Sequence, residues 1–115
     1  MTDITPSGAV MELAKIARQL DELGYKLRDA ERAAVNKEHA YRVAKAKALL
    51  AVDEGTVPER EAKALLETQS ERLSAKLAGA ELSILRREIS ICETRIEVGR
   101  SVVGVLRAEA MVAGA

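Results

Sequence analysis

The side chains best suited to chemistry in this sequence are its one histidine, His39, and its one cysteine, Cys92. A nucleophilic cysteine needs a base beside it, and a metal site needs several ligands. The predicted helices put these two residues in opposite parts of the chain. No Gly-rich phosphate-binding loop, dinucleotide-binding fingerprint or nucleophile elbow occurs either. We therefore predict no catalytic residues, no metal and no cofactor, so the chain is not expected to be an enzyme.

Basic residues form two clusters that could contact phosphate groups. Acidic neighbours such as Glu38 and Glu93 dilute both clusters, and the aromatic side chains that stack on single-stranded bases are scarce. Nucleic-acid binding is therefore the alternative interpretation, and solvated helix surface is the simpler one. The residues of the two clusters are Arg42, Lys45 and Lys47, then Arg86, Arg87, Arg100 and Arg107.

Composition favours long helices over a thick globular core. Hydrophobic residues make up 48% of the 115 residues, but aromatic residues only 2%, and alanine dominates the apolar set. Eighteen basic residues balance eighteen acidic ones, so no overall field attracts nucleic acid or an anionic membrane. No stretch reads as a signal peptide or membrane span, and the single cysteine suits a reducing compartment. We expect one all-α domain in the cytoplasm, with no membrane partner.

The helix signals predict an antiparallel hairpin over residues 1–115. A first helix is expected over about 6–52, a turn over 53–56 and a second helix over about 57–112. Thr5 or Ser7 can cap the first helix, and Gly55 can take the left-handed conformation that ends it. Thr56 and Glu59 form a T-x-x-E capping box at the start of the second helix.

Apolar residues three and four apart define a coiled-coil seam between the two helices. A turn at 53–57 pairs Leu13 with Ile96 and sets Lys37 opposite Glu71 as a buried ion pair. Small residues meet in the middle of the hairpin, which is also polar and is therefore the expected place for bending. The seam rows are Leu13, Leu20, Leu27, Ala34, Tyr41 and Ala48 with Ile16, Leu23, Ala30, Lys37, Ala44 and Ala51, against Leu82, Ile89, Ile96, Val103 and Ala110 with Leu85, Cys92, Gly99 and Leu106.

The second helix carries a further apolar row that the seam does not use. It lies about 160° around the helix from the seam, so the first helix cannot cover it. An apolar row of this length marks an interaction surface. We expect a second copy of the chain to cover it, giving a four-helix-bundle homodimer, parallel or antiparallel, although a different protein is the alternative partner. The row consists of Leu77, Ile84, Ile91, Val98, Val105 and Val112.

Three segments of the chain resemble small uncharacterised helical proteins of tailed bacteriophages. The segments are E-H-A-Y-R-V-A-K-A-K-A-L-L at 38–50, E-G-T-V-P-E-R-E-A at 54–62, and R-I-E-V-G-R-S with V-L-R-A-E within 95–109. Those proteins are encoded near replication and recombination genes in phages of Gram-positive, particularly actinobacterial, hosts. The resemblance implies a context and transfers no catalytic residues. Together with the exposed row, it predicts an oligomeric coiled-coil adaptor or accessory protein in phage DNA replication, recombination or counter-defence.

Overall fold

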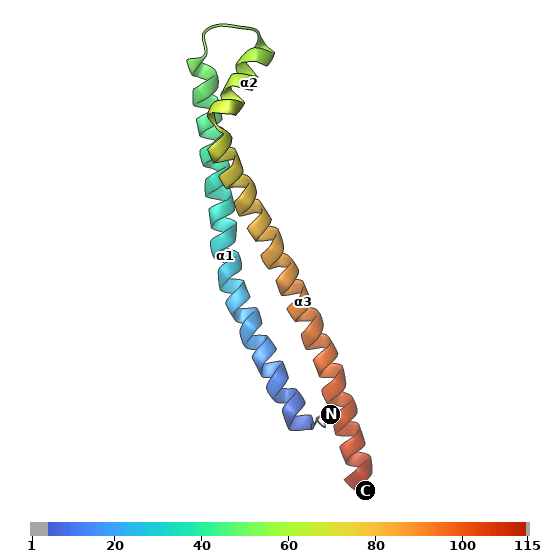
Figure 1. The fold of residues 1–115 in the computed structure, drawn as a ribbon. Helices are drawn as coiled ribbons and strands as arrows, with labels where there is room; N and C mark the ends of the chain where they lie inside the picture. Colours follow the sequence, from blue (N-terminus) through green and yellow to red (C-terminus); the bar gives the residue numbers. More distant parts are fainter. Residues whose placement is uncertain (1–4, 115) are drawn as a thin grey trace. The chain divides into compact units, whose positions relative to one another are not determined.

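The computed structural model describes residues 5–114, which are helical except at the start and at two connections (Figure 1). Helix α1 spans Pro6–Ala51, α2 spans Val57–Glu67 and α3 spans Gln69–Gly114. The all-α prediction and the two long antiparallel helices are confirmed. The prediction of one continuous second helix over 57–112 is wrong, because α2 and α3 are separate helices that meet at Thr68.

Thr68 interrupts the helix without the help of proline or glycine. Its backbone angles are φ −111° and ψ 21°, outside the α-helical range. Its hydroxyl donates a hydrogen bond of 2.7 Å to the carbonyl oxygen of Ala64, which also accepts from the backbone N–H of Thr68 at 3.1 Å. A threonine that bonds back to the preceding turn weakens and bends a helix. Bending was expected in this polar region, and Thr68 is where it occurs.

The connection between α1 and α2 follows the predicted turn chemistry. Gly55 has φ 101°, in the left-handed region that favours glycine. The Thr56 hydroxyl accepts a hydrogen bond from the Glu59 backbone at 3.4 Å, and the Glu59 carboxylate accepts one from the Thr56 N–H at 3.3 Å. Arg60 adds two bonds, donating to the carbonyl oxygens of Gly55 at 3.1 Å and Asp53 at 3.3 Å. The connection is therefore held by a complete capping box and an arginine that bridges the turn.

The cap at Thr56 should contribute measurably to stability. We expect Thr56→Ala to lower the free energy of unfolding by about 1 kcal/mol, because the N–H of Glu59 loses its acceptor. Thr56→Ser keeps the hydroxyl and should stay close to the wild type. Urea unfolding followed by circular dichroism compares the three chains, and equal midpoints for alanine and wild type would show that the capping box contributes nothing.

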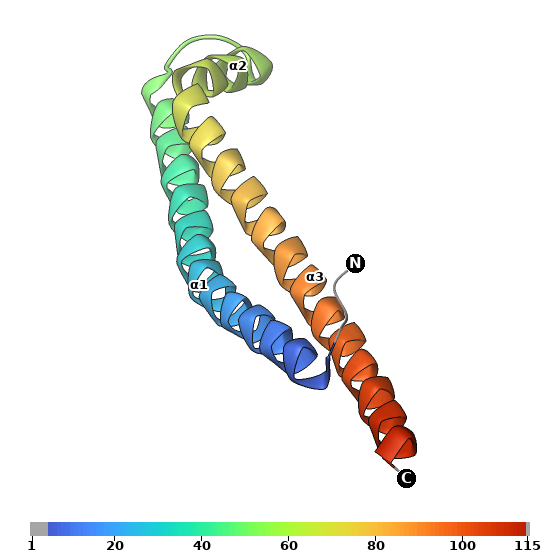
Figure 2. The same cartoon turned by 60° about the horizontal axis from the view of Figure 1, so that its bottom comes forward.

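The chain divides into two units, and the first contains both of its ends. It comprises Met1–Lys26 and Leu85–Ala115, so segments of α1 and α3 run beside one another in opposite directions (Figures 1 and 2). Leu85, Cys92 and Val103 are buried along α3, as the seam predicts. Gly99 lies directly against the side chain of Leu13. The predicted partner of Leu13 was Ile96, so this contact lies about one helical turn further along α3.

The second unit, Leu27–Ile84, has a core of small side chains. Ala30, Ala48, Ala64 and Ala75 are buried, together with Thr68. Small residues are therefore buried in this unit, as the sequence predicts, and each of them buries little apolar area.

The predicted buried ion pair between Lys37 and Glu71 does not form. Both residues line one shallow hollow of about 240 Å³ in the second unit. Lys37 is exposed, and Glu71 instead accepts a 3.1 Å hydrogen bond from the hydroxyl of Ser70. Within residues 5–114 no ion pair joins the two side chains. Lys37 keeps its ammonium group in water, because the free-energy cost of removing a charge from water exceeds the stabilisation by one ion pair.

Candidate interaction surface

The apolar row on α3 is exposed at every position. Its exposed fractions range from 47% at Ile91 to 79% at Val112. The seam positions of the same helix, such as Leu85 and Cys92, are buried, so the two rows face different surroundings. We call the exposed row the α3 stripe; it consists of Leu77, Ile84, Ile91, Val98, Val105 and Val112.

A single chain buries too little to form a complete core. Among residues 5–114, no large side chain is fully buried, and only Ala64 reaches 0% exposure. The chain exposes 8879 Å² of surface, whereas a compact folded chain of this mass exposes about 6,100 Å². Many large apolar side chains lie on this exposed surface. Such exposure points to contacts with a partner.

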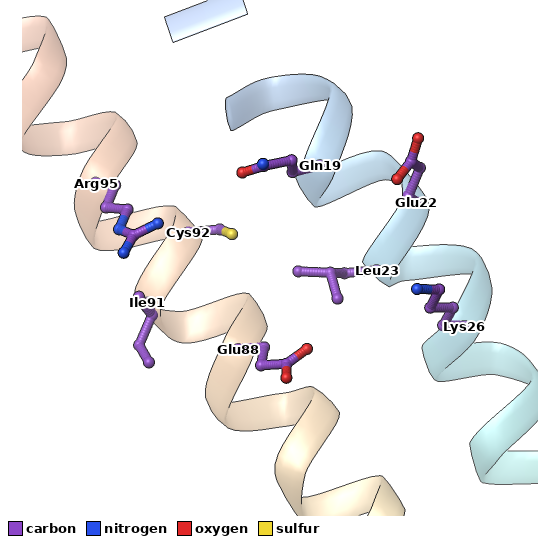
Figure 3. A pocket seen from close by; sticks show the side chains of 8 residues that line it. All are labelled: Gln19, Glu22, Leu23, Lys26, Glu88, Ile91, Cys92 and Arg95. Atoms are coloured by element: carbon purple, nitrogen blue, oxygen red, sulfur yellow. The ribbon is translucent and has the colours of Figure 1, made fainter. Parts of the chain in front are cut away.

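A groove in the first unit runs between α1 and α3, and part of the stripe lines it (Figure 3). Leu23 and Cys92 point toward one another from the two helices. The groove has a volume of about 340 Å³ and is open to solvent. Its lining residues are Gln19, Glu22, Leu23 and Lys26 from α1 with Glu88, Ile91, Cys92 and Arg95 from α3.

A second hollow of about 340 Å³ lies on α3 in the same unit. Its lining is almost wholly apolar and includes Val98 and Val105 of the α3 stripe together with Val102. The stripe therefore borders this hollow as well as the groove, and side chains of a packed helix would fit between its residues.

Sequence reasoning missed the part that α1 plays in this surface. Gln19, Glu22 and Lys26 line the groove, and Glu12 and Lys15 continue the same row at spacings of three and four residues. All five side chains are exposed. The spacing alone indicates one helix face, but only the structure shows that this face lies beside Ile91.

The two basic clusters fall in different units. In the second unit Arg42 donates to the Glu38 carboxylate at 3.1 Å, and Lys45 is half-buried. In the first unit Arg86, Arg100 and Arg107 share one row of α3, which Glu93 interrupts. Neither cluster presents an uninterrupted run of positive charge.

The candidate chemical residues lie apart from one another. His39 is exposed and belongs to the second unit, whereas Cys92 is buried in the first unit. Residues 5–114 contain no group of acidic, histidine and cysteine side chains that could hold a metal ion. In the same part of the chain, no helix combines the length and apolar character that a membrane crossing requires.

Comparison of the sequence and the structure with protein-family models, curated proteins and solved structures finds no match.

Proposed function

We propose that the chain is a non-enzymatic, oligomeric coiled-coil adaptor that acts through protein contacts made by the α3 stripe. The observation that carries this proposal is the exposure of all six stripe residues, while residues 5–114 contain no fully buried large side chain. Aliphatic rows at seven-residue spacing are the contact surfaces of packed helices. Covering such a row removes apolar area from water, which is the main driving force of association.

The biological context that we propose is accessory work in phage DNA replication, recombination or counter-defence in the cytoplasm of the host. It rests on the resemblance of the segments at 38–50, 54–62 and 95–109 to small phage proteins. An adaptor in such a setting would bind a phage or host protein while held in an oligomer.

The test of this function is the mass of the assembled protein. We expect light scattering at micromolar concentration to give a multiple of 12.4 kDa, with the dimer favoured. A mass of 12.4 kDa together with full helicity would contradict the oligomeric adaptor. A pull-down from infected cells, with the Ile91→Glu chain as the matched control, then identifies any partner that requires the stripe.

Direct nucleic-acid binding is the second candidate, and the row formed by Arg86, Arg100 and Arg107 is the observation that favours it. Glu93 interrupts that row, and the formal net charge of the whole chain is zero. We therefore expect no retention of DNA or RNA in a gel-shift assay at low salt, because phosphate binding requires concentrated positive charge. Retention that falls steeply with added salt, and that Arg100→Glu abolishes, would favour the nucleic-acid binder.

A further inference from the structure

We infer that the occupant of the groove in the first unit is a second copy of the same groove. The two copies would be related by a twofold axis that passes beside Gln19 and Ile91, with α1 on α1 and α3 on α3, each pair antiparallel. This inference rests on the proposed function, and it adds the identity and orientation of the partner. It is carried by charged side chains on the two helices that line the groove.

The charges of the row on α1 change sign about its centre, so the row is complementary to a reversed copy of itself. Its residues are Glu12, Lys15, Gln19, Glu22 and Lys26, all on one exposed face. Laid antiparallel on a copy of itself with Gln19 at the centre, Glu12 meets Lys26 and Lys15 meets Glu22. By the twofold symmetry each contact occurs twice, and no like charges meet. Among the described residues of the single chain, Lys15 pairs only with Glu12 of its own helix, at 3.4 Å.

The row on α3 has the same property. Glu88, Ile91 and Arg95 line the groove from this helix. Antiparallel about Ile91, Glu88 meets Arg95 of the second copy on both sides of an Ile91–Ile91 contact. Neither side chain forms an ion pair within residues 5–114, so both are available for this contact. Moving the centre one heptad to Val98 would instead bring Glu88 against Glu109.

The two centres lie in one groove. Gln19 and Ile91 line the same groove, so a single twofold axis can serve both helices. Nothing in the sequence alone requires the centre of the charged row on α1 to lie beside the centre of the row on α3. The face also carries three acidic and three basic side chains, which suits a copy of itself better than a strongly charged partner.

The other twofold arrangement of two hairpins is electrostatically unfavourable. It would stack α1 on α3 of the second copy at the same level. Glu22 and Glu88 both line the groove, and this stacking would bring them near each other across the interface. Lys15 would similarly meet Arg95. Like charges at an interface cost affinity, so the charge pattern selects the first arrangement.

Charge reversal distinguishes the two arrangements. We expect Glu88→Arg and Arg95→Glu each to raise the dimer dissociation constant about tenfold, because each replaces two attractive contacts by repulsion. The double variant restores the pairing and should return to within about threefold of the wild type. Sedimentation equilibrium measures all four chains. Both residues are exposed, so folding should be unaffected, and circular dichroism checks that it is.

Cysteine crosslinking provides the geometric test. Gln19→Cys should form a disulfide-linked dimer under mild oxidation, because the two copies of residue 19 meet at the axis. Glu12→Cys is the matched control, since its copies would lie about 21 Å apart along the helix. The wild-type chain controls for Cys92, which is buried.

Each outcome decides the inference. Tighter dimers of the two single charge variants would establish α1 on α3 and overturn it. The inference would also be overturned if neither charge reversal changes the dimer dissociation constant and Gln19→Cys forms no disulfide-linked dimer. If that dimer still dissociates on Ile91→Glu, the adaptor proposal stands while this orientation fails. A wild-type chain of single-chain mass would overturn both.

Discussion

Ile91→Glu is expected to convert the assembled protein into single chains of 12.4 kDa while leaving its helicity intact. Ile91 is 47% exposed in the single chain, so about half of its side chain remains to be covered by a partner. Burying that half contributes about 1 kcal/mol per copy. In the proposed dimer two carboxylates would also meet on the twofold axis, and burying them costs more than the lost apolar contact. The dissociation constant should therefore rise at least about 100-fold.

The controls for Ile91→Glu come from the same chain. Val35 is an exposed apolar residue of α1 outside the groove and the stripe, with 68% exposure, so Val35→Glu should leave the mass unchanged. Ile91→Leu keeps volume and apolar character and should remain assembled. Light scattering over a concentration series measures all three. If Val35→Glu and Ile91→Glu dissociate the protein equally, the stripe has no special part in assembly.

Leu85→Ala is expected to cause the largest loss of stability within a single chain. Leu85 is 5% exposed and is the most buried large side chain that the structure shows. Truncating a buried leucine costs about 2 to 5 kcal/mol, because its contacts are lost and a cavity remains. A domain of this size has a total stability of about 5 to 15 kcal/mol, so the variant could lose a large share.

The measurement is best made in an Ile91→Glu background, where unfolding is not coupled to dissociation. Urea unfolding of the Leu85→Ala chain is compared with that of Leu66→Ala. Leu66 lies on α2 and is 66% exposed, so its truncation should change stability by less than about 0.5 kcal/mol. A loss at Leu85 no larger than that at Leu66 would show that the buried seam does not stabilise the chain.

Most of the secondary structure could be predicted because its signals are local. Pro6 and the Thr56–Glu59 capping box mark helix boundaries through the chemistry of one or two turns, and the structure confirms both of them. Gly55 has the predicted left-handed conformation, although α1 already ends at Ala51. The heptad rows likewise predict which side chains of α3 are buried and which are exposed. Periodicity of this kind depends on the geometry of one helix and requires no knowledge of its neighbours.

The break at Thr68 could not be predicted from such signals. Threonine occurs inside many helices, and whether a hydroxyl bond to the preceding turn accompanies a break in the helix depends on the surroundings. Here Thr68 is 3% exposed and bonds the carbonyl of Ala64. Arg60 was missed for a similar reason, since its bonds to Gly55 and Asp53 depend on how the turn folds back.

The groove also could not be predicted from the sequence, because such a prediction requires the positions of the two helices along one another. The position of the turn predicts that Leu13 pairs with Ile96, whereas in the structure the Leu13 side chain lies against Gly99. A leucine side chain leans toward the start of its own helix, which is toward the end of an antiparallel neighbour. This direction accounts for the displacement of about one turn.

Because Cys92 is buried, its reaction with a thiol reagent reports on local opening of the native protein. Cys92 is 6% exposed, and its side chain points toward Leu23 inside the first unit (Figure 3). A thiol reagent can reach the sulfur only when the two helix segments of that unit separate locally. The rate at which the unaltered chain is labelled, relative to that of a free thiol, therefore gives the equilibrium constant for this opening. Any molecule that clamps the first unit shut would slow the labelling without a single substitution having been made.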